Sequence, residues 1–219
     1  MRKNADVINM DNLEKRVAAA LLDVKAVELN TEEPFTWASG LKSPIYCDNR
    51  KLLSYPVVRT FIAERLEEII REQFKKVDVI AAVATGAIAI GAIVADRMGL
   101  PLIYIRPKPK DHGTGSQIEG VFEKGASIVV IEDLISTGMS SLASVQAVTQ
   151  KGGMVEGMVA IFSYNFTKAR KAFEEANITL YTLTDYDTLI QVAGESSYIN
   201  ESEMSVLRDW RFKPENWGK

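Results

Sequence analysis

The chain has 219 residues, of which 47% are hydrophobic and 25% are charged, and its formal net charge is −3. This is the composition of an ordinary soluble globular protein, so it excludes a fibrous or largely disordered chain, and the mildly acidic balance argues against nucleic acid as the main partner. The single cysteine, Cys47, permits no intrachain disulfide and no cysteine-based metal cluster, which fits the reducing environment of the cytoplasm.

Two segments were compared with membrane and targeting signals. Residues 1–16 lack the apolar core of a signal peptide. The uncharged stretch from Val79 to Ala95 is rich in alanine, is interrupted by Gly86 and Gly91, and is too weakly apolar for a membrane-spanning helix. We therefore predict no membrane span.

The N-terminal quarter predicts a small unit that differs from the rest of the chain. Apolar residues at helical spacing predict a helix over residues 11–27. Residues 35–56 are rich in aromatic and turn residues, which predicts short strands and loops, and Pro56 is a start signal for a helix over residues 56–74. We divide the chain into an N-terminal helix and hood, residues 1–55, and a core of residues 56–219.

Strand-like and helix-like segments alternate from residue 77 onward. We expect strands over residues 77–83, 101–105, 127–131, 154–162 and 178–183, and helices ending at residue 97 and over residues 141–151, 168–177 and 201–212. Such alternation is typical of right-handed crossovers in a parallel sheet. The predicted fold class is α/β, with a mostly parallel central sheet flanked by helices.

The segment SIVVIEDLISTGMSS, residues 127–141, carries the clearest chemical signal. An apolar run, Ile128–Ile131, is typical of a strand buried on both faces, and it leads directly into Glu132 and Asp133. A turn of hydroxyl residues and glycine follows, where the amides of a helix N-terminus favour a phosphate. Because carboxylates repel phosphate, they should serve sugar hydroxyls or a metal ion, so the pattern indicates a sugar phosphate. The alternative is a plain connection in which Glu132 or Asp133 caps the helix.

A long polar loop separates two of the predicted strands. Residues 106–125 contain three cations near the start, the single histidine, and several glycines. Long loops in compact domains are often functional lids, and these residues suit a lid that closes over a polyanion. We predict a mobile lid at residues 106–120. The alternative is a solvated surface loop.

The motifs together resemble a known family. VVIEDLISTGMSS resembles the phosphoribosyl pyrophosphate motif of type I phosphoribosyltransferases, and with RPKPKDHG and FTWASGLKSPIYCDNR the sequence is similar to the orotate phosphoribosyltransferases, from about Phe35 to the last predicted strand. The resemblance implies the type I phosphoribosyltransferase fold with a hood over the base site. It also implies cytoplasmic, Mg²⁺-dependent transfer of the phosphoribosyl group from 5-phosphoribosyl 1-diphosphate to orotate, giving orotidine 5′-monophosphate and pyrophosphate in de novo pyrimidine biosynthesis.

The resemblance also assigns roles to residues. Glu132 and Asp133 would hold the ribose hydroxyls, and the turn after them would cradle the 5-phosphate. The residues implied for binding 5-phosphoribosyl 1-diphosphate are Thr85, Gly86, Arg106, Lys110, His112, Glu132, Asp133, Leu134, Ile135, Ser136, Thr137, Gly138, Met139 and Ser140. Those implied for catalysis are Lys110, His112 and Asp133, and those implied for orotate are Ser39, Gly40, Tyr46 and Ser136. Mg²⁺ would need no dedicated protein side chain, and a homodimer would share its lids across the interface.

The chain departs from the family pattern at several cationic positions. Some relatives carry a cation where this chain has Ala38, Thr85, Pro107 and Asn165, and Lys42 and Lys108 are candidates to compensate. Two alternative functions stay open at this point. One is a non-catalytic regulator that senses phosphoribosyl pyrophosphate, and the other is a phosphoribosyltransferase for another base.

Overall fold

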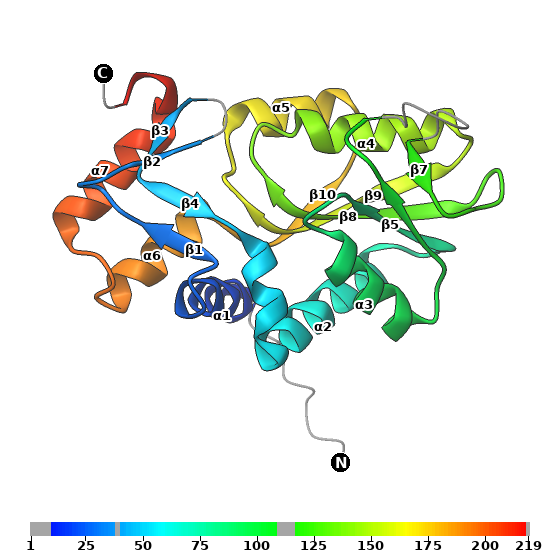
Figure 1. Cartoon of the computed structure of the whole chain (residues 1–219), viewed down its shortest axis with the longest axis horizontal. Coiled ribbons are helices and arrows are strands. Elements are labelled where there is room, and N and C mark those ends of the chain that lie inside the picture. The colour runs from blue at the N-terminus through cyan, green and yellow to red at the C-terminus, as the bar shows by residue number, and fades with distance from the viewer. Residues whose placement is uncertain (1–9, 38–39, 109–116, 218–219) are drawn as a thin grey trace, which may run out of the picture.

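The computed structural model describes residues 10–37, 40–108 and 117–217 and is built around one six-stranded sheet (Figure 1). The helices are α1 (Met10–Asp23), α2 (Pro56–Gln73), α3 (Ile88–Met98), α4 (Met139–Gln150), α5 (Thr167–Glu175), α6 (Tyr186–Glu195) and α7 (Glu201–Phe212), with short 3₁₀ turns η1 (Asn49–Ser54) and η2 (Pro214–Asn216). The strands are β1 (Val27–Leu29), β2 (Phe35–Thr36), β3 (Lys42–Ser43), β4 (Ile45–Cys47), β5 (Val79–Val83), β6 (Leu102–Ile105), β7 (Ile118–Glu119), β8 (Ser127–Ile135), β9 (Met154–Ser163) and β10 (Leu180–Asp185).

The central sheet is mostly parallel, as predicted. Its strand order is β10-β9-β8-β5-β6-β7, and of these strands only β7 runs antiparallel to its neighbour, β6. Because the parallel strands share one direction, their carboxyl ends meet at one edge of the sheet. The ends of β5, β6 and β8, and the loops that follow them, therefore lie close together.

Helices cover both faces of this sheet, which explains the apolar runs in its strands. Helices α4 and α5 lie on one face, whereas α2 and α3 lie on the other (Figure 1). Alternate residues of β8 enter the two resulting cores: Val129 and Ile131 pack with the α2 and α3 side, and Ile128 and Val130 pack with the α4 and α5 side. A strand buried on both faces has no polar side to show in its sequence.

Strand β8 continues further than the sequence predicted. We expected the strand to stop before the acidic pair, but β8 extends to Ile135, so Glu132 and Asp133 lie inside it. The reason is that β9 is also long: Leu134 pairs with Phe162 and Ile135 with Ser163. The two carboxylates therefore have the fixed backbone of a sheet strand.

The hood is formed by segments from both ends of the chain. Strands β1 and β4 pair antiparallel, as do β2 and β3, in two small sheets. The indole N–H of Trp210 in α7 donates to the carbonyl of Lys42, and the ring centroids of Trp37 and Trp210 lie 5.8 Å apart. Helices α6 and α7 lie beside these strands in Figure 1. The C-terminal helices therefore support the hood, while the division at residue 55 stays a prediction.

Several predicted elements need correction. The first helix ends at Asp23 rather than at residue 27, because Val27 pairs with Cys47 in a strand. The last strand covers Leu180–Asp185 rather than residues 178–183, and α6 follows it where no helix was predicted. Asp185 starts α6, since its side chain accepts a hydrogen bond from the Thr188 amide.

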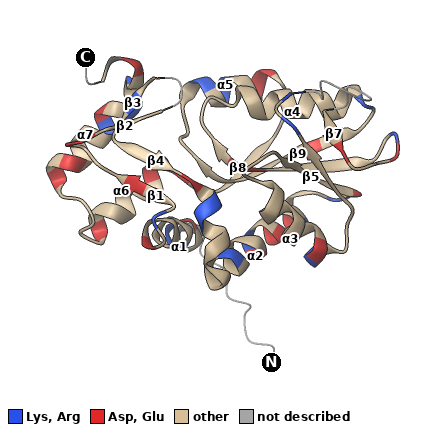
Figure 2. Ribbon diagram, in the orientation of Figure 1, with Lys and Arg blue, Asp and Glu red and all other residues tan. Residues whose placement is uncertain are grey.

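No helix in the described part of the chain is both long and apolar enough to cross a membrane. Acidic and basic residues are interspersed on the outer helices α2 and α3 (Figure 2).

Candidate functional site

A cavity of about 380 Å³ lies at the carboxyl ends of β5 and β8. It brings together seven residues that the sequence assigned to the sugar phosphate: Thr85, Gly86, Glu132, Asp133, Leu134, Ser136 and Ser140. Further lining residues are Val83, Ala84, Pro107, Gln117, Ala143 and Ser144. Segments that are far apart in the chain thus form one site at the edge of the sheet where ligands bind in open α/β folds.

Glu132 is a buried carboxyl group with hydroxyl and amide donors. Its side chain is 5% exposed, and its two oxygens accept hydrogen bonds from the Asp133 amide at 3.1 Å and from the Ser141 hydroxyl at 2.9 Å. Burial, together with repulsion from Asp133, raises the pKa of Glu132 to about 8. Ser141, in the first turn of α4, was not among the predicted site residues.

Asp133 lies directly against the turn that follows β5. Burial raises its pKa as well. A Cβ atom added at Gly86 would be 2.2 Å from Oδ2 of Asp133, so a glycine is needed at residue 86 for the carboxylate to approach so closely. The predicted sugar-binding carboxylate and the predicted pyrophosphate turn are therefore in contact.

The turn after β8 has the geometry of an anion site. Gly138 has a φ of 78° and precedes α4, whose first-turn amides have no partner within the helix. A Cβ at Gly138 would lie 2.9 Å from the ring of Phe173 in α5, so close packing on α5 also requires a glycine. The Thr137 amide donates to Oγ of Ser136 at 2.6 Å, which tightens the turn.

Two hydrogen bonds join Arg106 and Gln117 into a narrow neck just after β6. The Arg106 amide donates to the Gln117 carbonyl at 2.8 Å, and Nε2 of Gln117 donates to the Arg106 carbonyl at 2.7 Å. The guanidinium group of Arg106 also forms an ion pair with the Glu119 carboxylate at 3.8 Å. Ile118–Glu119 form β7, so the last residues of the predicted lid segment 106–120 pair with the sheet, and the mobile lid itself stays a prediction. Gln117 was not among the predicted site residues.

Other predicted site residues are not on the cavity wall. Ile135, Thr137, Gly138 and Met139 belong to the same strand and turn, and the side chain of Ile135 lies in the core. Gly40 and Tyr46 lie in the hood, where Tyr46 is 37% exposed and packs on Phe35 at a centroid distance of 5.6 Å. Ser39, Lys110 and His112 lie outside the described residues.

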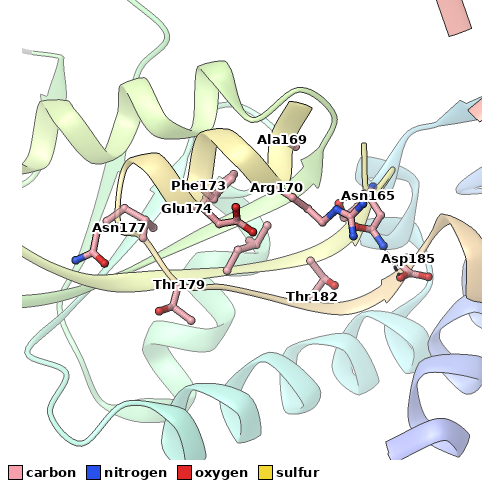
Figure 3. Close-up of a pocket in the computed structure, with 12 residues that line it drawn as sticks. Asn165, Ala169, Arg170, Phe173, Glu174, Asn177, Thr179, Thr182 and Asp185 are labelled. Carbon is pink, nitrogen blue, oxygen red and sulfur yellow. Dashed lines mark hydrogen bonds between the residues drawn. The ribbon is translucent and has the colours of Figure 1, made fainter. Parts of the chain in front are cut away.

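A second and larger cavity, about 550 Å³, lies between α5 and the end of β9 and β10 (Figure 3). Its lining residues include Asn165, Arg170, Glu174 and Asp185, which Figure 3 labels. None of the predicted site residues lines this cavity. Asp185 already accepts hydrogen bonds from the Thr188 amide and the Asn165 side chain. Its charged groups are therefore satisfied or exposed, so we assign the chemistry to the smaller cavity.

The chain is similar to known proteins over most of its length. The phosphoribosyl transferase domain family matches residues 53–179, more than half of the chain. The orotate phosphoribosyltransferase of Listeria innocua is 53% identical over 208 residues, covering 95% of this chain and 100% of the relative. The chain belongs to the orotate phosphoribosyltransferases. The corresponding relative from Enterococcus faecalis is 53% identical over 210 residues, covering 96% of this chain and all of the relative.

Solved structures of orotate phosphoribosyltransferases and a related enzyme share the fold. The Aeropyrum pernix orotate phosphoribosyltransferase superposes with a TM-score of 0.73 at 27% identity and covers 84% of this chain and 99% of its own. The UMP synthase of Leishmania donovani gives a TM-score of 0.79 at 25% identity over 94% of this chain, which spans 44% of that longer protein. The family resemblance and the fold class predicted from the sequence are therefore confirmed.

Proposed function

We propose that this protein transfers the phosphoribosyl group of 5-phosphoribosyl 1-diphosphate to orotate, releasing pyrophosphate and forming orotidine 5′-monophosphate. The observation that carries the proposal is the buried pair Glu132 and Asp133, which lies between a hydroxyl turn and the Gly86 turn. The hydroxyl turn suits the 5-phosphate, and the Gly86 turn suits the pyrophosphate. The ribose hydroxyls between them need hydrogen-bond acceptors, which the two carboxyl groups supply.

The closeness of Asp133 to Gly86 supports a position for the scissile bond between them. The anomeric carbon of ribose stands between the 2′-hydroxyl, held by the acidic pair, and the pyrophosphate, held at Thr85 and Gly86. Departure of pyrophosphate leaves positive charge on the ribose and negative charge on the leaving group, so the protein acts by positioning both. In this proposal Arg106, Lys110 and His112 stabilise the pyrophosphate, and Ser136 contacts orotate with the hood residues Ser39, Gly40 and Tyr46.

We propose that Mg²⁺ binds with the substrate beside the acidic pair. Carboxylate oxygens are ligands that Mg²⁺ accepts, and a cation there would favour the charged forms of Glu132 and Asp133, whose pKa values are raised mainly by burial. When bound, the ion would neutralise part of the negative charge on the pyrophosphate. Glu132 and Asp133 hold the ribose hydroxyls in their place and fix the sugar relative to both anion sites.

A direct test of substrate choice uses purified protein, Mg²⁺ and labelled 5-phosphoribosyl 1-diphosphate with orotate, uracil, adenine and guanine in parallel. We expect consumption of orotate alone. Faster turnover of uracil or a purine would identify a phosphoribosyltransferase for another base. Tight binding of 5-phosphoribosyl 1-diphosphate without turnover of any base would instead identify a regulator, and either result contradicts the proposal.

We also propose a homodimer in which each lid closes over the partner's site. Residues 107–116 lie between Arg106 and Gln117, and a chain of that length that returns to its start can span at most about 17 Å at about 3.4 Å per residue. A subunit with Lys110→Ala and one with Asp133→Ala should each be nearly inactive alone. After subunit exchange, about half of the dimers are mixed and each has one complete site, so activity should recover to roughly a quarter of wild type. No recovery after verified exchange would mean that each lid serves its own subunit.

A further inference from the structure

Strand β8 extends beyond its neighbour β5 at the place where the acidic pair lies. The pairing between these strands ends where Ala82 meets Ile131, whereas the pairing of β8 with β9 continues to Ile135. One edge of β8 therefore lacks a strand partner alongside Asp133. A buried backbone carbonyl at such an edge requires a hydrogen-bond donor from another part of the protein.

Asn49 supplies this donor from the hood. Its Nδ2 donates to the Asp133 carbonyl at 2.6 Å, across 84 positions of sequence, and the residue is 4% exposed at the start of η1. The amide of the side chain thus joins the N-terminal segment to the backbone of a residue in the acidic pair. Nothing in the sequence motif for the sugar phosphate points to Asn49.

The other end of this amide has no partner. Oδ1 of Asn49 is buried and accepts no hydrogen bond from any described residue. An unsatisfied buried oxygen costs free energy that offsets much of the gain from the Nδ2 hydrogen bond. Asn49 therefore contributes little to the stability of the fold, and its conformation requires another explanation.

We propose that Asn49 is a positioning residue for the ribose-binding carboxylates: its hydrogen bond to the Asp133 carbonyl holds the end of β8 in the orientation that directs Glu132 and Asp133 toward the sugar. This inference rests on the proposed function. The hood segment thereby takes part in sugar recognition as well as in covering the base. Because Asn49 reaches only the backbone of Asp133, it acts through the carboxylates and does not itself contact the substrate.

The test measures two ligands separately in the full-length protein. Ribose 5-phosphate depends on the acidic pair, whereas pyrophosphate alone depends on the Thr85 and Gly86 turn. Isothermal titration calorimetry of Asn49→Ala should show about fivefold weaker binding of ribose 5-phosphate, the value of one lost hydrogen bond, and less than a twofold change for pyrophosphate. The KM for 5-phosphoribosyl 1-diphosphate should rise and kcat should fall, while the melting temperature changes by no more than about 2 °C.

A matched control is Asn200→Ala. Asn200 also bonds a backbone group through its side chain, accepting from the Glu203 amide in the capping box of α7, far along the chain from the acidic pair. We expect this variant to lower the melting temperature by a few degrees and to leave both ligand affinities unchanged. Asn49→Ala should therefore change ligand affinity with little change in melting temperature, whereas Asn200→Ala should change the melting temperature and leave ligand affinity unchanged.

If Asn49→Ala fails to fold, Asn49→Leu provides the same test, because leucine has a similar branched shape and removes both polar groups. Equal losses for both ligands, or unchanged binding of ribose 5-phosphate in a folded variant, would overturn the proposal. Failure of the proposed function is a separate outcome, since the wild-type protein would then not convert orotate at all.

Discussion

The cavity beside β8 and the cavity beside α5 differ in how their charged groups are satisfied. The α5 cavity is larger, about 550 Å³ against about 380 Å³. Its carboxylate Asp185 has two donors, and Arg170 and Glu174 are exposed to solvent. Glu132 beside β8 is buried next to a second carboxylate, and the pKa values of both are raised.

Two adjacent carboxyl groups with raised pKa values, and not the volume of the cavity, are therefore the reason for proposing the β8 cavity as the reactive one. Two adjacent carboxylates inside a strand are unfavourable in the free protein, so they persist where a ligand relieves the cost. The α5 cavity contains no comparable pair of buried carboxyl groups among the described residues. Substitutions in the two regions should therefore separate effects on activity from effects on stability.

The largest expected effect is that of Gly86→Ala. A methyl group there would clash with the Asp133 carboxylate, which must move away from the sugar position. We expect kcat/KM to fall at least about 100-fold in a steady-state assay, on the order of 3 kcal/mol of transition-state stabilisation. Gly194→Ala is the control, because its methyl group would meet only the flexible end of Met204 in α7. Activity within twofold of wild type for Gly86→Ala would contradict the assigned contact.

The next effect concerns the pH dependence of stability. The folded-state pKa of Glu132, about 8, lies above the ordinary value of 4.5, so the folded protein binds more protons than the unfolded chain between these pH values. The free energy of unfolding should therefore fall as pH rises from about 5 to 8, by up to about 1.4 kcal/mol per pH unit from this group, and level off above pH 8.

Glu132→Gln removes this titration. Urea unfolding at several pH values should show that the variant gains stability relative to wild type as pH rises through this range. Ser144→Ala is a suitable control, since that hydroxyl lies in the same cavity but bonds the Ser140 carbonyl and carries no charge. Parallel pH curves for wild type and Glu132→Gln would show that Glu132 is ionised in the folded protein.

A smaller effect is expected in β10, the strand beside the second cavity. Thr184 is 1% exposed, and its hydroxyl has no hydrogen-bond partner among the described residues. Thr184→Val keeps the shape and removes the unsatisfied group, so we expect stability to rise by about 1 kcal/mol with activity unchanged. Chemical denaturation measures the first and the orotate assay the second. Loss of activity would assign this region a part in the reaction.

The smallest effect is expected for Arg170→Ala on the wall of the α5 cavity. Arg170 is exposed, and surface substitutions of this kind usually change stability by less than about 0.5 kcal/mol. We expect kcat and KM within about twofold of wild type. A tenfold rise in the KM for orotate would move the base site toward α5 and would remove the distinction between the two cavities.

The buried strand beside the site could be predicted from the sequence, and the sugar-phosphate chemistry proposed for the site came from the same local pattern. The apolar run into Glu132 and Asp133, with the hydroxyl turn after it, predicted a buried strand and a sugar-phosphate site, because strand burial and helix N-termini leave local patterns. The alternation of strands and helices predicted the parallel sheet for the same reason. The family followed from motifs spread over most of the chain.

Long-range contacts were decided only by the tertiary structure. The extension of β8 to Ile135 depends on the length of β9, and the supports for the hood come from α6 and α7 at the other end of the chain. Gln117 and Asn49 act through hydrogen bonds to backbone carbonyls, which every residue possesses and no sequence pattern distinguishes. Local sequence patterns therefore indicate which residues are candidates for the chemistry. The contacts that hold these residues in place form only when distant segments of the chain pack together.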